Sequence, residues 1–360
     1  QPLMSGGINY GNNSGMAVTS MGNNTLTWET ADQYDFGFDL GFWNGKLNMI
    51  ADVYLKNTNN LLYSMPLHGT SGFTSITNNI GSMRNYGVEF SINGHMNLGK
   101  VNWTSSFNIS HNKNKLTKLL GDDLLPIGSN RALKVGEELG AFYLFQMDGI
   151  YQYDGEVPQP LYDLGVRAGD VKYHDVDNNG IINDSDRVLT GSSNPDFFGG
   201  WNNTFKYKGF QLDVFFTYMY GNDVYAEWAV TATRPGYRMA ITEDAAKNRW
   251  TAPGSSNKYP RAVNTLCGHN SKNSTRFLED GSFIRLRSLT FSYTFPQVML
   301  QKIRMKGLRL YVQGDNLLLF SKYSGWDPEV SKNMDPQYFG VDLYGVPPSR
   351  SVNFGINLSF

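Results

Sequence analysis

The chain of 360 residues contains one cysteine, Cys267. A single thiol excludes an intrachain disulfide framework and any zinc site built on paired cysteines. The five histidines are scattered and show no HExxH spacing. The net charge of −1 gives no reason to expect nucleic acid as a partner.

Enzyme motifs are also missing. The sequence has no GxSxG elbow, no P-loop and no cysteine–histidine pair in a plausible frame. We therefore expect a protein that is not an enzyme and has no catalytic residues.

The sequence has no apolar run of about 18 residues, the length that a transmembrane helix requires. A membrane β-barrel needs no such run, because its strands alternate apolar and polar residues. Aromatic residues and glycine are abundant, with 22 Phe, 21 Tyr, 7 Trp and 38 Gly. This composition favours a large β-structure with many turns and aromatic girdles.

The last residues, 350–360, show the alternation most clearly. In an extended chain one face would carry Val352, Phe354, Ile356, Leu358 and Phe360. The other face would carry Asn353, Gly355, Asn357 and Ser359. Such a strand buries its apolar face in a soluble protein or turns it to lipid in an outer-membrane barrel.

The same pattern recurs along the chain and predicts nine strands. They are expected at about 34–42, 46–57, 86–92, 101–110, 197–207, 210–220, 283–295, 307–318 and 350–360. Short connections (43–46, 99–100, 208–209, 296–306) alternate with long ones (58–83, 117–196, 221–280, 319–349). This asymmetry is typical of bacterial outer-membrane barrels, with short periplasmic turns and long extracellular loops.

The sequence thus predicts an all-β, antiparallel transmembrane barrel over residues 32–360, preceded by a surface loop at 1–31. The apolar segment 138–150 would break the alternation of connections if it crossed the membrane alone. Either it stays above the membrane within the long connection 117–196, which we favour, or it crosses and a strand near 171–175 returns the chain. Bacterial single-chain barrels have an even number of strands, so we expect further strands upstream of Gln1. A soluble β-sandwich or β-repeat protein is the structural alternative.

The most specific local motif is the twelve-residue segment 175–186, which fits a calcium-binding loop. Its expected ligands are Asp175, Asp177, Asn179, the backbone carbonyl of Ile181, Asn183 and Asp186. Gly180 stands where such loops turn sharply, whereas position 12 holds Asp instead of the usual Glu. We expect bound calcium to tie this loop together; an Asn/Asp-rich turn without an ion is the alternative.

Aromatic residues of the long loops form a second candidate site. Their faces could stack on sugar rings or peptide side chains, or pack the loops onto one another. These residues are Tyr143, Tyr151, Tyr153, Trp228, Tyr237, Trp250, Tyr323, Trp326, Tyr338 and Tyr344.

Several stretches together resemble the C-terminal half of the SusC-like TonB-dependent transporters of the Bacteroidetes outer membrane. They are Asn85–Phe90, Gly169–Tyr173 leading into Asp175–Asp186, Asn194–Phe210, Leu278–Arg287, Val312–Leu317, Tyr323–Glu329 and the Phe-terminated last strand. Each stretch is weak alone, but the combination spans most of residues 27–360 and is specific.

The resemblance implies that these are the last strands of a barrel of about 22 strands in the outer membrane of a Gram-negative cell. It also implies an upstream plug and TonB box, energy from TonB, and a SusD-like surface lipoprotein that closes the barrel as a lid. The implied function is nutrient uptake, with this receptor importing oligosaccharides or, alternatively, peptides. Two rivals are a secreted soluble carbohydrate-binding module with a dockerin-like calcium loop and an outer-membrane enzyme.

Overall fold

The computed structural model of the chain describes residues 3–7, 11, 13–121, 124–236, 239–263, 268–301, 304–334 and 338–360. Nine of its strands form one antiparallel sheet in the order β19-β18-β17-β14-β13-β6-β5-β4-β3. Their bounds are β3 Thr30–Phe42, β4 Leu47–Pro66, β5 Ser75–Leu98, β6 Val101–Leu119, β13 Phe197–Tyr207, β14 Phe210–Tyr220, β17 Phe283–Thr294, β18 Gly307–Ser321 and β19 Ser351–Ser359. These are the nine strands that the alternation predicts.

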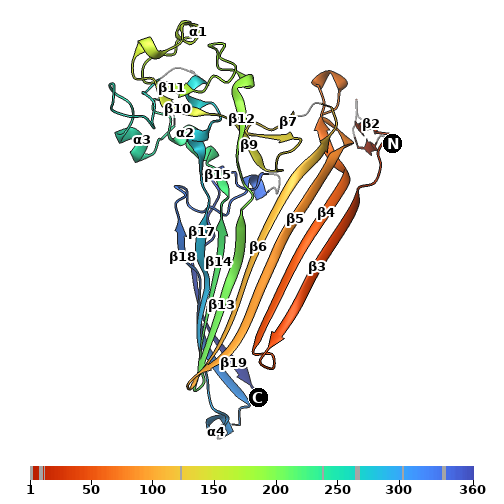
Figure 1. The fold of residues 1–360 in the computed structure, drawn as a ribbon, viewed down its shortest axis with the longest axis vertical. Helices are drawn as coiled ribbons and strands as arrows, with labels where there is room; N and C mark the ends of the chain where they lie inside the picture. Colours follow the sequence, from red (N-terminus) through yellow and green to blue (C-terminus); the bar gives the residue numbers. More distant parts are fainter. Residues whose placement is uncertain are drawn as a thin grey trace.

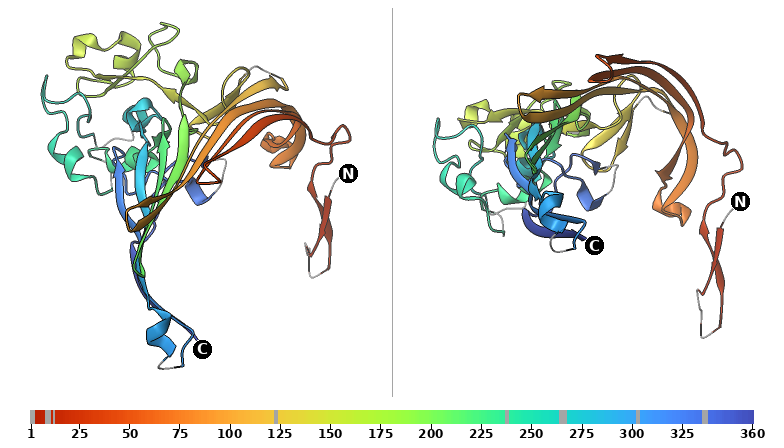
Figure 2. Two further views of the ribbon diagram at one scale, coloured as in Figure 1. Left: turned by 60° about the horizontal axis from the view of Figure 1, so that its bottom comes forward. Right: turned by 90° about the horizontal axis from the view of Figure 1, so that it is seen from below.

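The sheet is a tall curved wall (Figures 1 and 2). Its edge strands, β3 and β19, do not pair with each other. Every neighbouring pair is antiparallel, and successive strands in the sequence lie side by side throughout.

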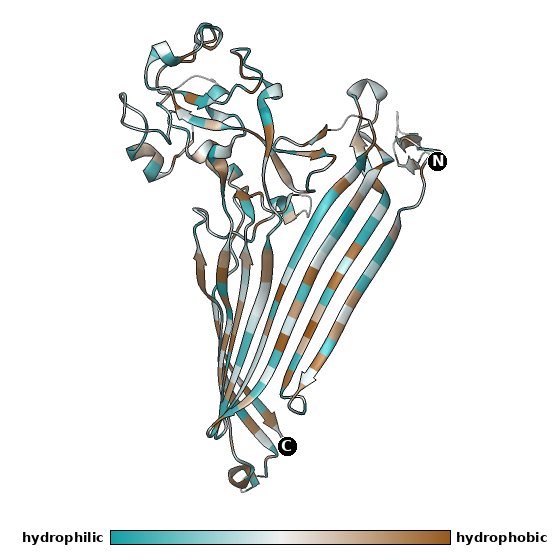
Figure 3. Ribbon diagram, in the orientation of Figure 1, coloured by the Kyte–Doolittle hydropathy of each residue, from teal (hydrophilic) through white to brown (hydrophobic). Residues whose placement is uncertain are grey.

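The two faces of the wall differ as the alternation requires. On β19, Phe354 is 83% exposed and Ile356 is 65% exposed, with no protein layer over them. Phe36 on β3 is 73% exposed. The opposite face carries polar pairs such as Tyr54, whose hydroxyl donates to the Asn112 side chain at 2.9 Å. Bands of hydrophobic and hydrophilic residues therefore alternate along the strands (Figure 3).

Short connections lie at one end of the wall, where β19 also ends (Figure 1). In the β3–β4 turn, Asn44 and Gly45 have φ angles of 56° and 79°. This left-handed backbone is the one that an Asn-Gly hairpin turn adopts. The longest of the four connections, between β17 and β18, contains α4 (Gln297–Leu300).

The predicted loop 58–83 is mostly strand, which corrects the sequence interpretation. β4 continues to Pro66 and β5 begins at Ser75, so only 67–74, with the 3-10 helix η1 (Gly69–Ser71), connects them. Register shifts between Thr58 and Leu62 interrupt the alternation, so the strand pattern is hidden in the sequence. The predicted loop 1–31 likewise holds a short hairpin of β1 (Leu3–Gly6) and β2 (Met16–Ser20).

The remaining long connections fold into a body at the other end of the wall (Figure 1). The first contains β7 Leu124–Ile127, β8 Arg131–Lys134, β9 Ala141–Phe145, β10 Met147–Ile150, η2 Asp154–Glu156, α1 Gln159–Asp163, β11 Val171–Tyr173, η3 Asp184–Asp186 and β12 Arg187–Ser192. The second contains β15 Asp223–Tyr225, α2 Glu227–Ala232, α3 Glu243–Lys247, η4 Gly268–Ser271, η5 Thr275–Phe277 and β16 Leu278–Asp280. The third contains η7 Lys332–Met334.

The segment 138–150 stays off the wall, as predicted. β9 joins a four-stranded sheet with β12, β8 and β7, and β10 pairs only with β11. No helix among the described residues is long and apolar enough to cross a membrane.

Three apolar clusters hold this loop body together. The central cluster takes residues from all three long connections, including Phe142, Tyr225, Phe277 and Val341. A second cluster lies within the first connection, around Phe145, Tyr151, Val171 and Tyr173. The third cluster joins the body to the wall through Ile80, Leu116, Leu119 and Leu133.

Candidate functional site

The segment 175–186 brings three of its predicted ligands together. One carboxylate oxygen each from Asp175, Asp177 and Asp186 lies within 4.8 Å of the others. Asp186 is fully buried, and its two oxygens accept the backbone N–H groups of Val176 at 2.9 Å and Asn183 at 2.8 Å.

Backbone N–H groups also orient Asp175. Gly180 N–H donates to it at 2.7 Å and Asn179 N–H at 3.2 Å. Desolvation alone would raise the pKa of Asp175, but these hydrogen bonds outweigh it and lower the pKa. Gly180 has φ +78°, which provides the sharp turn that the motif needs.

The other predicted ligands have partners of their own. The Asn179 side-chain oxygen accepts from Ile181 N–H at 2.8 Å. The Asn183 oxygen accepts from Ser185 N–H at 2.9 Å and thereby caps η3. Asn183 is thus engaged in starting a helical turn, a role that its position in the motif did not suggest.

The three carboxylates fit a hard cation. No lysine or arginine in the described part of the chain forms an ion pair with them, whereas neighbouring Asp184 pairs with Arg187 at 3.0 Å. Three negative charges gathered without a counter-charge repel one another, and Ca²⁺ takes such oxygen ligands. Asp175, Asp177 and Asp186 would hold the ion.

The predicted aromatic residues do not form one site. Several pack inside the body: Tyr151 belongs to the second cluster, Tyr323 to the central cluster, and Trp228 and Tyr338 lie against the central cluster. Trp250 donates its indole N–H to the Gln152 side chain at 3.1 Å, and the Tyr143 hydroxyl donates to the Asp184 carbonyl at 3.3 Å. Tyr237 lies outside the described residues.

Three aromatic residues remain open to solvent: Tyr153 at 61%, Trp326 at 81% and Tyr344 at 59% exposure. Trp326 and Tyr344 share the lining of a hollow of about 770 Å³ with Val346, which is 93% exposed. We call Trp326, Tyr344 and Val346 the apolar rim. Trp228, which packs against the central cluster, lines the same hollow.

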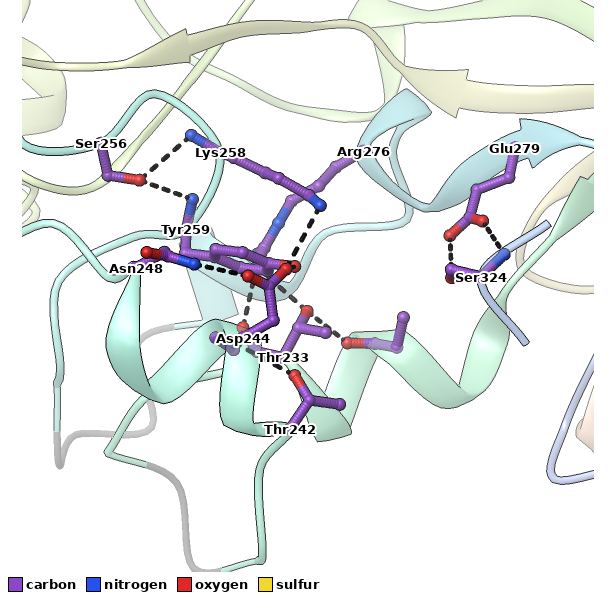
Figure 4. Close-up of polar contacts among 12 residues, drawn as sticks. Thr233, Thr242, Asp244, Asn248, Ser256, Lys258, Tyr259, Arg276, Glu279 and Ser324 are labelled. Atoms are coloured by element: carbon purple, nitrogen blue, oxygen red, sulfur yellow. Dashed lines mark hydrogen bonds and ion pairs between the residues drawn. The ribbon is translucent and has the colours of Figure 1, made fainter. Parts of the chain in front are cut away.

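Polar networks within the body escaped the sequence analysis. The Tyr259 hydroxyl donates to Asp244 at 2.6 Å, and Lys258 lies 3.6 Å from the same carboxylate (Figure 4). The hydrogen bond from Tyr259 lowers the pKa of Asp244. Arg276 donates to the Thr233 carbonyl at 2.8 Å, and burial lowers its pKa to about 10. These residues come from separate parts of the chain, so no local motif predicts that they meet.

A curved antiparallel wall with one apolar outer face and loops gathered at one end defines the class of outer-membrane β-barrels. The family model of the TonB dependent receptor-like β-barrel matches residues 2–317. The chain belongs to this family and is an outer-membrane protein.

Relatives support the same placement. TonB-dependent receptor P3 of Formosa agariphila is 33% identical over 96% of this chain and 36% of its own length. TonB-dependent receptor SusC of Bacteroides thetaiotaomicron is 29% identical over 94% of this chain and 32% of its own length. Among solved structures, the RagAB peptide transporter matches with a TM-score of 0.83 and 26% identity, over 100% of this chain and 38% of that one. The chain therefore spans little more than a third of such relatives.

Proposed function

We propose that this chain supplies wall and outer loops to a SusC-like importer that takes up oligosaccharides through the outer membrane, driven by TonB. The observation that carries the proposal is the loop body: three long connections share one core at one end of a membrane wall. A plug and further strands supplied by the rest of the transporter would close the barrel. Oligosaccharides are the substrate that the sequence resemblance implies, and similarity to the RagAB peptide transporter favours peptides as the second candidate.

The loop body would face outward and contact a SusD-like lipoprotein lid. Its apolar rim supports this role, because exposed aromatic and apolar residues beside a hollow are typical of interaction sites. Exposed apolar side chains elsewhere in the body, such as Leu164 and Met334, do not line this hollow.

Charge placed on the rim should separate the lid from the barrel. We expect the double substitution Trp326→Asp and Val346→Asp to abolish co-purification of the lipoprotein and uptake of the oligosaccharide. Leu164→Asp, at a residue that is also exposed (73%), is the matched control and should leave both intact. Unchanged co-purification of the double variant would refute the contact, and uptake of peptides alone would favour the second candidate.

We further propose that Asp175, Asp177 and Asp186 bind calcium and tie the outer loop together. The ion would neutralise the three carboxylates and hold 175–186 in its present turn. Calcium should therefore protect the segment 151–196 from limited proteolysis, and a chelator should remove that protection.

Asp186→Asn should abolish the calcium effect, because the substitution removes the buried member of the cluster. Asp184→Asn is the control, since the Asp184 side chain is 85% exposed and pairs with Arg187. Equal cleavage with and without chelator in the unsubstituted protein would contradict the proposal.

A further inference from the structure

A pocket of about 310 Å³ lies between the wall and the β7–β8 hairpin. On β6, Leu116 and Asn114 line it, and they share the face of Asn112, which is the polar face of the wall. The pocket is therefore on the inner side of the wall, away from the lipid-facing residues. Its lining is mainly apolar, and Arg131 is the only charged residue among the described lining residues.

Arg131, at the start of β8, is 6% exposed. A guanidinium has five N–H donors, and three hydrogen bonds are made here, all to neutral oxygens. Nη1 donates to the Gly140 carbonyl at 3.2 Å, and Nη2 donates to the Ser193 hydroxyl at 3.2 Å and to the Phe339 carbonyl. The buried Nε has no partner in the described part of the chain.

No carboxylate of the described residues forms an ion pair with Arg131. Buried Arg285, by contrast, pairs with Asp327 at 2.6 Å. Burial lowers the pKa of Arg131 to about 10, so the side chain is still a cation at neutral pH. A buried charge without a counter-charge is costly, and an anion that enters the pocket would relieve that cost.

The lining also limits the kind of anion. One cation balances one negative charge, and Leu133, Ile80 and Met83 offer only apolar surface for the rest of a ligand. A dianion such as phosphate would bring an unpaired charge into this environment. About 310 Å³ is near the lower end of the usual size of small-molecule sites.

We propose that this pocket binds a small ligand in which one carboxylate is joined to an apolar group, with the carboxylate beside the Arg131 guanidinium. Both the C-terminal leucine of a peptide and a short fatty acid carry this chemistry. The site goes beyond the proposed import, because it predicts binding at the inner wall whatever solute is transported.

Ligand-observed NMR on the intact, detergent-solubilised outer-membrane protein tests the proposal with three probes. They are N-acetyl-leucine, its amide N-acetyl-leucinamide, and octanoate. We expect at least one acid to bind about tenfold or more tightly than the neutral amide, because only an acid forms the ion pair. The preferred acid then identifies the peptide or the fatty acid as the source.

Three substitutions separate the effect of the charge from that of the cavity. Arg131→Met should remove the preference for acid over amide, and Arg131→Lys should retain part of it. Leu139→Trp, at a lining residue that is 43% exposed, should fill the mouth and block acid binding while leaving Arg131 in place.

If the Arg131 variants fail to fold, the proposal is still tested by comparing acid and amide binding in the unsubstituted protein and in Leu139→Trp. Equal binding of acid and amide, or acid binding that Leu139→Trp leaves unchanged, would overturn the proposal. Because binding is measured without energy coupling, a negative result would not bear on import.

Discussion

Individual buried polar residues hold the long connections of the loop body together. Asp170 is fully buried and accepts two hydrogen bonds from Arg261, at 2.9 and 3.0 Å, and one from the Asn270 side chain at 2.8 Å. Next to it, His269 donates its Nε2–H to the Val171 carbonyl at 2.8 Å. These contacts tie the second long connection to β11 in the first.

His269 should make this junction sensitive to acid. Burial lowers its pKa from 6.5, and the hydrogen bond to Val171 and the charge of Asp170 only partly oppose this, while Lys272 adds to it. The pKa of His269 is lower in the folded than in the unfolded protein. The stability that neutral His269 contributes is therefore fully present above about pH 6.5 and is lost as the pH drops toward the folded pKa. We expect the protection factors of the Val171–Tyr173 amides, which compare their exchange rates with those of an unfolded chain at the same pH, to fall between pH 7 and 5. The reason is that the free energy of unfolding drops by up to about 1.4 kcal/mol per pH unit.

His269→Asn should flatten that pH dependence, whatever it does to stability at neutral pH. His174→Asn is the control, because His174 is exposed and meets only Asp148, at 3.1 Å. The same pH dependence in His269→Asn as in the unsubstituted protein would assign the effect to another group.

At the scale of the strands, tyrosine rings cover glycines across the sheet. Tyr54 faces Gly87, and in the same way Tyr218 faces Gly199 and Tyr311 faces Gly355. A side chain at each glycine would collide with the opposite ring. Such pairs fix the register of neighbouring strands, because a slip would place a ring against a larger residue.

Gly87→Ala should therefore destabilise the wall by about 1–3 kcal/mol, the usual cost of overpacking. The added Cβ would lie 2.6 Å from the Tyr54 hydroxyl and also against the His111 carbonyl. Gly94→Ala in the same strand is the matched control, since its nearest neighbour would be a Leu47 methyl at 3.8 Å. The measurement is the midpoint of denaturant unfolding in micelles, and equal midpoints for the two variants would disprove the role of the pair.

For the molecule as a whole, the central cluster is the critical feature. Phe142 comes from the first long connection, Phe277 from the second and Val341 from the third, and all are buried. Tyr225 N–H donates to the Gly340 carbonyl at 2.8 Å and so joins the second and third connections by backbone as well.

Phe277→Ala should loosen all three connections together. Phe277 is 1% exposed, and removal of a buried phenylalanine side chain costs about 3–5 kcal/mol. We expect new protease cleavage sites in 120–196, 221–282 and 322–350 at the same protease concentration. Tyr153→Ala, at an exposed residue of the same body, should add none. Cleavage confined to the second connection would show that the three fold independently.

The wall could be predicted from the sequence because alternation is a local signal. Phe354 and Asn353 reveal their faces without knowledge of any partner strand. The signal failed where it was interrupted, as in β4 beyond Thr58. The candidate calcium ligands were also local, and three of them converge.

The loop body could not be predicted in this way. Phe142, Tyr225 and Val341 meet although they are far apart in the sequence, and none lies in a long periodic segment. Arg131 looks like an ordinary surface cation until the structure buries it against Phe142, with its guanidinium 4.6 Å from the ring centre. The environment of these residues is set by packing between segments that are far apart in the sequence, and such packing leaves no local sequence pattern.

The shared core of the three connections has a mechanical consequence. Those connections join β6 to β13, β14 to β17 and β18 to β19, so six neighbouring strands of the wall lead into the same apolar core. A force applied to any one connection from outside is therefore distributed over all six strands. Docking at the apolar rim would be felt across this whole sector of the wall.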